Sequence, residues 1–475
     1  MLLGTVIGAL SQFLLPIVLP DKDHVGALAL LNSVSRIFAT VFTLGFTQIT
    51  LQVFEEFRDE KRGHNGYLIF AFIYALVGIV LGFLSFYLLQ DVFLGVGEEY
   101  QLVRSLAVLI FPAIFFRILF TVMDAYLRML YKSVAGAFWE GFLLKLLILI
   151  GILLFWLSWI DYKYLAYIYT FALSLPGLAM LVMAFLNTKK FKLPKRQMLS
   201  KNSLSEVVKY GAYGLIATTS GVLVVSIDQV MVNNLIGTGA TGVYSIMFFA
   251  GVLVSIPARG IKRIAVPVLT DKWKNNDLKE IESVYRKSVV NLTVMATYLF
   301  VVGWLCIAPA LSYLPQYQEG LYVFFFIGLG QLLDMMTGVN MEVIATSSSY
   351  RLNTYFNIAL AVLVIGLNFL FIHFMGLVGA ALASAIAMFA VNAARWYFLK
   401  RKYGFQPFTK EIFITLVLGG GLIALFKLLP FTLHPIIAIL VYAVAVTVLF
   451  WAIVLKLNLA PDVKDWLLKI KRRFI

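Results

Sequence analysis

Long apolar runs alternate with short polar breaks along almost the whole chain. Each run has about 20 residues or more, the length that a helix needs to cross the ~30 Å hydrocarbon core of a bilayer. The pattern predicts fourteen membrane-spanning helices, at 2–20, 25–54, 66–89, 102–127, 134–158, 162–186, 207–235, 240–269, 286–311, 320–346, 350–373, 376–399, 411–430 and 434–457. We therefore expect an all-α polytopic membrane protein without a separate soluble domain.

Lysine and arginine are concentrated in every second polar break. With Met1 placed in the cytoplasm, most of the 39 basic residues fall in seven cytoplasmic segments, at 55–65, 126–133, 187–209, 259–288, 350–353, 395–410 and 456–475. The positive-inside rule then predicts that both termini are cytoplasmic. The formal charge of +15 is thus mainly a topology signal that also attracts anionic membrane lipid. It does not indicate a nucleic-acid partner.

The most polar and basic break separates six predicted helices from the eight that follow. Gly26 in the second helix and Gly242 in the eighth occupy similar places, as in the internal repeats of transporters. We predict five regions: an N-terminal six-helix bundle at 1–186, a basic cytoplasmic linker at 187–206, a C-terminal six-helix bundle at 207–400, two extra helices at 401–457 and a basic amphipathic cytoplasmic tail at 458–475.

Composition narrows the available chemistry. Hydrophobic residues make up 61% of the chain and charged residues only 13%, about half the charge of a typical soluble domain. The single cysteine, Cys306, excludes an internal disulfide and a multi-cysteine metal site. The sequence has neither a histidine metal motif nor a P-loop, so we expect no cofactor and no intrinsic ATPase activity.

Three basic residues lie near the middle of predicted spans: Arg36, Arg117 and Lys145. Each costs about 2.5–3.5 kcal/mol in hydrocarbon, so we expect them to face protein or a water-filled cavity. Arg36 belongs to a polar stripe along one helix face, made of Asn32, Arg36, Thr40, Thr43 and Thr47. Guanidinium groups bind phosphate oxygens in pairs, so these positions, with Asn32 and Thr40, predict a site for an anionic ligand.

Other charges inside the predicted helices allow a second interpretation. Four acidic residues are candidates for the same cavity or for ion pairs that only stabilise packing: Asp124, Glu140, Asp228 and Asp334. Three basic residues near the inner ends of helices are candidates for a cytoplasmic gate or for interface anchoring: Arg259, Lys262 and Arg351. The sequence alone leaves these alternatives open.

Three stretches resemble bacterial polysaccharide-biosynthesis membrane proteins. They are WEGFLLK at 139–145, SIDQVMVNNLIGTGATGVYSIM at 226–247, and GLGQLLDMMTGVNMEVIATSSSYRLN at 328–353 with Asp334, Gly338, Asn340 and Arg351. These proteins are flippases of lipid-linked oligosaccharides within the superfamily of multidrug, oligosaccharidyl-lipid and polysaccharide (MOP) exporters.

The resemblance implies two six-helix bundles that move an undecaprenyl-pyrophosphate-linked oligosaccharide across the bacterial cytoplasmic membrane by alternating access. Arg36, Arg117 and Lys145 would hold the pyrophosphate. Coupling to Na⁺ or H⁺ would involve Asp124, Glu140 or Asp228. Glycosyltransferases and a polysaccharide polymerase would be functional partners.

Two other functions remain as alternatives. One is a cation-coupled multidrug antiporter of the same superfamily, which would favour an acidic aromatic pocket. The deep basic residues count against this function. A membrane sugar polymerase or ligase would need an acid–base constellation on an outer loop. The predicted outer loops are short and nearly uncharged, so we do not expect an enzyme.

Overall fold

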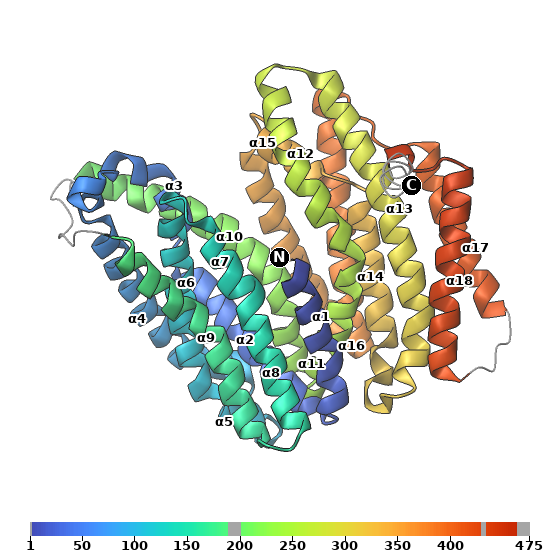
Figure 1. Ribbon diagram of the computed structural model, residues 1–475, viewed down its shortest axis with the longest axis horizontal. Helices are drawn as coiled ribbons and strands as arrows, with labels where there is room; N and C mark the ends of the chain where they lie inside the picture. Colours follow the sequence, from blue (N-terminus) through green and yellow to red (C-terminus); the bar gives the residue numbers. More distant parts are fainter. Residues whose placement is uncertain (1, 189–200, 429–433, 463–475) are drawn as a thin grey trace, which may run out of the picture. The chain divides into compact units, whose positions relative to one another are not determined.

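The computed structural model describes residues 2–188, 201–428 and 434–462, and within them every regular element is helical (Figure 1). Ten helices in this part of the chain are long and apolar enough to span a membrane, or twelve if each of two bent pairs is one span. The other two predicted spans correspond to α1 (Leu2–Val18), a shorter apolar helix, and to the second half of α16 (Arg351–Tyr403). The predicted all-α, multi-pass class is therefore confirmed.

The chain forms two compact units, Met1–Ser245 and Ile246–Ile475. Their boundary falls inside α11 (Thr238–Val252), whereas the sequence pattern placed the division at 187–206. Most of that predicted linker, and the tail from residue 463, lie outside the described residues. The five predicted regions therefore stay a prediction.

The first unit is built around α6, which packs against α2, α3, α4 and α9. Side chains from one face of α6, including Ile114, Ile118 and Val122, are fully buried there. After α1, the remaining helices of this unit are α2 (Lys22–Phe42), α3 (Phe46–Phe57), α4 (Tyr67–Leu94), α5 (Gln101–Ser105), α6 (Ala107–Met129), α7 (Ser133–Phe138), the π-helical turn η4 (Trp139–Leu143), α8 (Leu144–Trp156), α9 (Tyr162–Leu186) and α10 (Lys201–Leu235), with short 3₁₀ turns at Glu60–Arg62, His64–Gly66 and Glu98–Tyr100.

The predicted second helix, 25–54, is broken into α2 and α3. Leu44 and Gly45 have φ values of 48° and 71°, in the left-handed region that ends a right-handed helix. A Cβ atom at Gly45 would lie 2.1 Å from the carbonyl oxygen of Gly211. Only glycine therefore allows α10 to approach so closely. The polar stripe consequently stops at Thr43, and Thr47 belongs to another helix.

The second unit is built around α13, which packs against α12, α14, α17 and α18. Its elements after α11 are η6 (Leu253–Ser255), α12 (Ile256–Lys274), α13 (Leu278–Leu311), η7 (Pro315–Gly320), α14 (Leu321–Met335), α15 (Asn340–Thr346), α16, α17 (Lys410–Leu428) and α18 (Pro435–Lys456). One apolar cluster joins α13 to α17 and α18 through residues such as Val301, Leu422 and Phe450.

Helix α16 is a hairpin rather than one straight rod. Gly376 has φ 57° and ψ −134°, which are not helical. A Cβ atom at Gly379 would lie 2.0 Å from the carbonyl oxygen of Phe371, although eight residues of a straight helix span about 12 Å. The chain therefore turns back at Gly376, as the separate predicted spans 350–373 and 376–399 require.

Candidate functional site

A cavity of 220 Å³ lies among helices of the first unit. It contains two of the three basic residues predicted to bind an anion, Arg36 and Arg117, together with Glu140. The described residues that line it are Arg36, Ala39, Thr40, Arg117, Phe120, Thr121, Glu140, Leu144, Leu173, Pro176 and Val222. The charged side chains among these residues are thus two arginines and one glutamate.

Arg117 is held in place by one residue of α2. Its Nη2 donates to the side-chain oxygen of Asn32 at 2.5 Å, and its Nη1 donates to the backbone oxygen of Asn32 at 3.4 Å. Arg36 and Glu140 lie near enough to interact with its charge, but no described carboxylate lies within ion-pairing distance of it. Asn32 thus positions the guanidinium without neutralising it.

Arg36 is exposed and lines the same cavity. Its side chain has neither a hydrogen bond nor an ion pair with any residue that the structure describes. Thr40, one turn further along α2, lines the same cavity. An uncompensated charge at this depth is costly in hydrocarbon, so the cavity suits water or an anion. Two guanidinium groups are therefore available to phosphate oxygens.

Glu140 reaches the cavity from the π-helical turn η4. Such turns insert one extra residue into a helix and are common at functional sites. In the described residues, the Glu140 carboxylate has no hydrogen bond or ion pair. It can therefore compete with an anionic ligand for the two arginines, or bind a cation.

Lys145 faces a different neighbour. A Cβ atom at Gly8 of α1 would lie 2.9 Å from Cδ and 3.4 Å from Nζ of Lys145, so this side chain packs along α1. Lys145 does not line the cavity that holds Arg36 and Arg117. The structure thus brings together two of the three predicted basic residues, and a binding role for Lys145 stays a prediction.

Two of the predicted acidic residues lie outside this cavity. Asp124 is buried and forms an ion pair with Arg128 at 2.5 Å, and its carboxylate packs on Gly136. Asp228 is fully buried and accepts a hydrogen bond from the Tyr244 hydroxyl at 2.7 Å. These contacts match the packing interpretation, and an ion-coupling role for either residue stays a prediction.

Asp334 belongs to a buried polar network in the second unit. Asn392 donates to Asp334 at 2.7 Å and accepts from Arg395 at 3.2 Å, while Arg395 also donates to Asn357 at 2.7 Å. Asn340, just after the break between α14 and α15, donates to Asn392 at 3.2 Å. The network ties both arms of the α16 hairpin to the broken helix α14–α15.

Sequence reasoning counted Arg395 with the cytoplasmic loop at 395–410, but the structure buries it at 5% exposure. Arg395 follows Asn392 by three residues, so both side chains lie on the same helix face. This spacing was the signal that could have indicated a contact between them. Sequence reasoning also missed seven of the eleven described lining residues of the first-unit cavity, among them Thr121 and Pro176. Thr121 follows Arg117 by one turn, and Pro176 lies inside α9.

The three predicted gate or interface residues lie in the second unit. Lys262 forms an ion pair with Glu342 at 3.4 Å. Arg351 lies over the Tyr350 ring, with its guanidinium carbon 5.8 Å from the ring centre. Arg259 is exposed on α12. Whether these residues form a gate stays a prediction.

The sequence is similar to known polysaccharide-biosynthesis proteins. A family model described as "Polysaccharide biosynthesis protein" matches residues 2–273. The capsular polysaccharide biosynthesis protein CapF of Staphylococcus aureus is 26% identical over 185 residues, which are 38% of this chain and 46% of CapF. The match therefore spans less than half of that relative.

Two solved transporters have a similar fold. The lipid II flippase MurJ in an inward closed conformation has a TM-score of 0.70 at 13% identity, covering 95% of this chain and 98% of that chain. A multidrug resistance MATE family transporter of the MOP superfamily, in an inward-facing conformation, has a TM-score of 0.65 at 16% identity, covering 84% of this chain and 94% of that chain. At such identities the likeness concerns the fold.

Proposed function

The chain belongs to the polysaccharide biosynthesis protein family, and from this premise we propose that it is a flippase for an undecaprenyl-pyrophosphate-linked oligosaccharide. The lipid-linked sugar would cross the membrane by alternating access, for the assembly of a surface polysaccharide. The fold that the chain shares with a lipid II flippase and with MATE family transporters supports a transport function rather than an enzymatic one.

The observation that carries the proposal is the pair of guanidinium groups in the first-unit cavity. Arg117 is oriented by a neutral asparagine, and no described carboxylate is paired with Arg36 or Arg117. Hydrogen bonds between charged partners contribute about 1.5–3 kcal/mol each, so two arginines can hold a pyrophosphate while the sugar extends beyond the cavity. The cavity of 220 Å³ is too small for a whole oligosaccharide but accommodates a phosphate-bearing group.

Reconstitution tests this proposal directly. The purified protein would be placed in proteoliposomes with a fluorescent undecaprenyl-pyrophosphate oligosaccharide, and the rate of transfer between leaflets would be measured. We expect Arg36→Ala and Arg117→Ala to slow transfer about ten-fold or more, since each removes at least one charged hydrogen bond of about 1.5–3 kcal/mol.

Arg401→Ala is a matched control. Arg401 is exposed in the last turn of α16 and does not line the cavity, so its removal changes the net charge equally. Transfer at the wild-type rate by both cavity variants, with normal insertion, would refute the assigned site. Equal slowing by all three variants would indicate a general charge effect instead.

One observation favours a second candidate function, a cation-coupled multidrug antiporter. Glu140 supplies a carboxylate in the same cavity, and carboxylates suit cationic ligands. The same proteoliposomes distinguish the two. An antiporter would accumulate a cationic dye in a Glu140-dependent manner, and Arg36→Ala would leave that activity intact.

The remaining features follow from the same proposal. The protein would lie in the bacterial cytoplasmic membrane with both termini in the cytoplasm, as its basic loops predict. Glycosyltransferases would supply its substrate and a polymerase would consume its product. A Na⁺ or H⁺ gradient would drive transport through one of the acidic residues, with Glu140 placed best because it shares a cavity with the arginines.

A further inference from the structure

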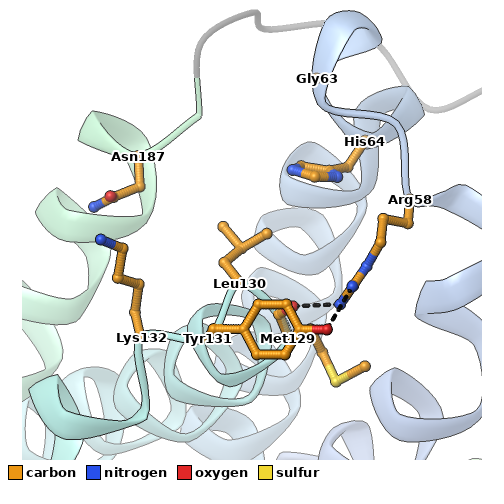
Figure 2. A pocket seen from close by; sticks show the side chains of 8 residues that line it. All are labelled: Arg58, Gly63, His64, Met129, Leu130, Tyr131, Lys132 and Asn187. Carbon is orange, nitrogen blue, oxygen red and sulfur yellow. Dashed lines mark hydrogen bonds between the residues drawn. The ribbon is translucent and has the colours of Figure 1, made fainter.

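A second cavity, of 190 Å³, lies in the first unit and is lined from three separate segments (Figure 2). The segments are the loop after α3, the turn between α6 and α7, and the end of α9. The lining residues are Arg58, Gly63, His64, Met129, Leu130, Tyr131, Lys132 and Asn187. Among the described residues, this lining contains basic and polar groups and no acidic side chain. Neither the proposed transport path nor the family match assigns the cavity a role.

The cavity lies at the ends of candidate membrane spans, where we expect lipid headgroups. Its polar residues directly follow or precede the ends of candidate spans: Arg58 follows Phe57, Lys132 precedes Ser133, and Asn187 follows Leu186. The distribution of basic residues predicts that these ends face the cytoplasm. A ligand here would thus meet the protein where the apolar core of the membrane ends and the phosphates begin.

The backbone around the cavity is unusual. Four consecutive residues, Gly63 to Gly66, have positive φ values of 61°, 48°, 53° and 86°, and two of them, His64 and Asn65, are not glycine. Across the cavity Tyr131 also has φ 59°. Left-handed conformations are unfavourable for residues with a Cβ atom and persist mainly where the surroundings or a function require them. Both walls of the cavity therefore contain backbone strain.

One wall is fixed by Arg58. Its Nη1 donates to the Tyr131 hydroxyl at 3.0 Å, and its Nη2 donates to the Met129 carbonyl oxygen at 2.5 Å (Figure 2). Nη2 also lies 3.1 Å from a carboxylate oxygen of Glu55, and the guanidinium carbon lies 5.4 Å from the centre of the Phe54 ring. Arg58 thus connects the loop after α3 to the turn between α6 and α7, so that the cavity is ordered before any ligand arrives.

The opposite wall carries a cation that is available to a ligand. Figure 2 shows the Lys132 ammonium extended beside the Asn187 amide, across the cavity from Arg58. The Lys132 side chain is exposed and has no hydrogen bond or ion pair with any part of the chain that the structure describes. His64, buried at 6% exposure, forms part of the wall between them. An ordered polar pocket with an unused ammonium group suits a small anion.

We propose that this cavity binds the phosphate group of an anionic phospholipid in the cytoplasmic leaflet. Lys132 contacts the phosphate, and Arg58 positions the wall. Basic pockets between helices on the cytoplasmic side of membrane proteins bind anionic headgroups in this way. Tyr131 is 83% exposed and lies at the edge of the site. Aromatic rings are enriched at the membrane–water interface, where this site would lie.

Lipid titration of the purified full chain tests the site. The thermal midpoint in neutral detergent would be followed against added phosphatidylglycerol, phosphatidylcholine or inorganic phosphate. We expect saturable stabilisation by phosphatidylglycerol alone. Lys132→Ala should raise the half-saturating concentration about five-fold, the factor equivalent to ~1 kcal/mol per basic residue near an anionic lipid surface. Lys132→Arg should retain binding.

Lys61→Ala is the matched control, because Lys61 is exposed in the same loop region but does not line the cavity. It should change half-saturation less than two-fold. Equal weakening by the two alanine variants would overturn the proposal in favour of general surface charge. Saturation by inorganic phosphate at the same concentrations would overturn the lipid assignment. Neither result bears on flippase activity, which Arg36 and Arg117 test separately.

Discussion

At the scale of single residues, the partner of a buried charge decides what that charge can do. Arg117 is oriented by Asn32, whose amide oxygen accepts a hydrogen bond without adding negative charge. Asp124, two turns further along α6, has Arg128 as its own ion-pair partner. Both charges were visible in the sequence, but only the partners separate a group that can bind a ligand from one that stabilises packing.

Asn32→Asp tests this distinction without changing the size of the side chain. The new carboxylate would lie at the 2.5 Å contact now made by the asparagine oxygen and would pair with the Arg117 guanidinium. We expect transfer of the pyrophosphate-linked substrate to fall about ten-fold or more, as in Arg117→Ala, since the neutralised guanidinium no longer attracts phosphate.

The corresponding control is Asn275→Asp, at an exposed position in the second unit that does not line the cavity. It should transfer substrate at the wild-type rate in the same proteoliposome assay. Unchanged transfer by Asn32→Asp, with normal protein levels, would show that the charge of Arg117 is not used in transport.

At the scale of helices, the path of the chain depends on breaks within the apolar helices rather than on helix length. Gly45 separates α2 from α3, and Gly376 folds α16 into a hairpin. Gly338, with φ 60°, lies in the break between α14 and α15, beside the network around Asn392. In each case a glycine adopts a conformation that is unfavourable for other residues, so the chain can change direction within an apolar run.

Gly376→Ala should destabilise the second unit. The backbone there, at φ 57° and ψ −134°, lies in a region that is essentially accessible only to glycine. A side chain would therefore add strain of about 1–3 kcal/mol. We expect a lower thermal midpoint in detergent, measured by the exposure of tryptophan or by loss of helical signal.

Gly366→Ala in the same helix provides the comparison. Gly366 is exposed, has a helical backbone and has open space around the position of a Cβ atom. Alanine is preferred to glycine in a helix by about 1 kcal/mol, so this variant should not lose stability. Equal loss in both variants would mean that the turn at Gly376 does not depend on its backbone conformation.

At the scale of the whole molecule, the chain is a multi-pass membrane protein made of two helical units. Each unit contains its own deep polar group: the arginine cavity in the first and the Asp334–Asn392–Arg395 network in the second. The predicted topology places the loops around Lys61 in the cytoplasm and the loop around Trp159 outside.

Cysteine labelling tests that topology. In a Cys306→Ala background, which removes the single native thiol, Trp159→Cys should react with a membrane-impermeant thiol reagent on intact cells. Lys61→Cys should react only after permeabilisation, because its loop would face the cytoplasm. Both positions are exposed, so accessibility within the protein does not limit the reaction. The reverse labelling pattern would invert the orientation and place the proposed headgroup pocket in the other leaflet.

Much of the fold could be predicted because each span must satisfy its backbone hydrogen bonds internally, which makes apolar runs reliable indicators of helices. The helix breaks at Leu44 and after Met335 were not predicted, because a break depends on what packs against the chain at that point. The cavity with the two arginines was partly predicted. The estimated depth of Arg36 and Arg117 within their predicted spans identified both residues, but the depth of Lys145 could not show that it faces α1. Arg395 was missed because its position near a helix end resembles that of an interface anchor.

The sequence by itself determined that this is an all-helical membrane protein, with basic loops that predict its orientation and with charges placed deep in apolar helices. These properties follow from the hydrophobic length of each segment and from the cost of placing charge in lipid, both of which are local. Only the tertiary structure decided which charges meet and which are kept apart. Side chains far apart in the sequence become neighbours through packing, as Arg117 does with Asn32, and no local pattern records that contact.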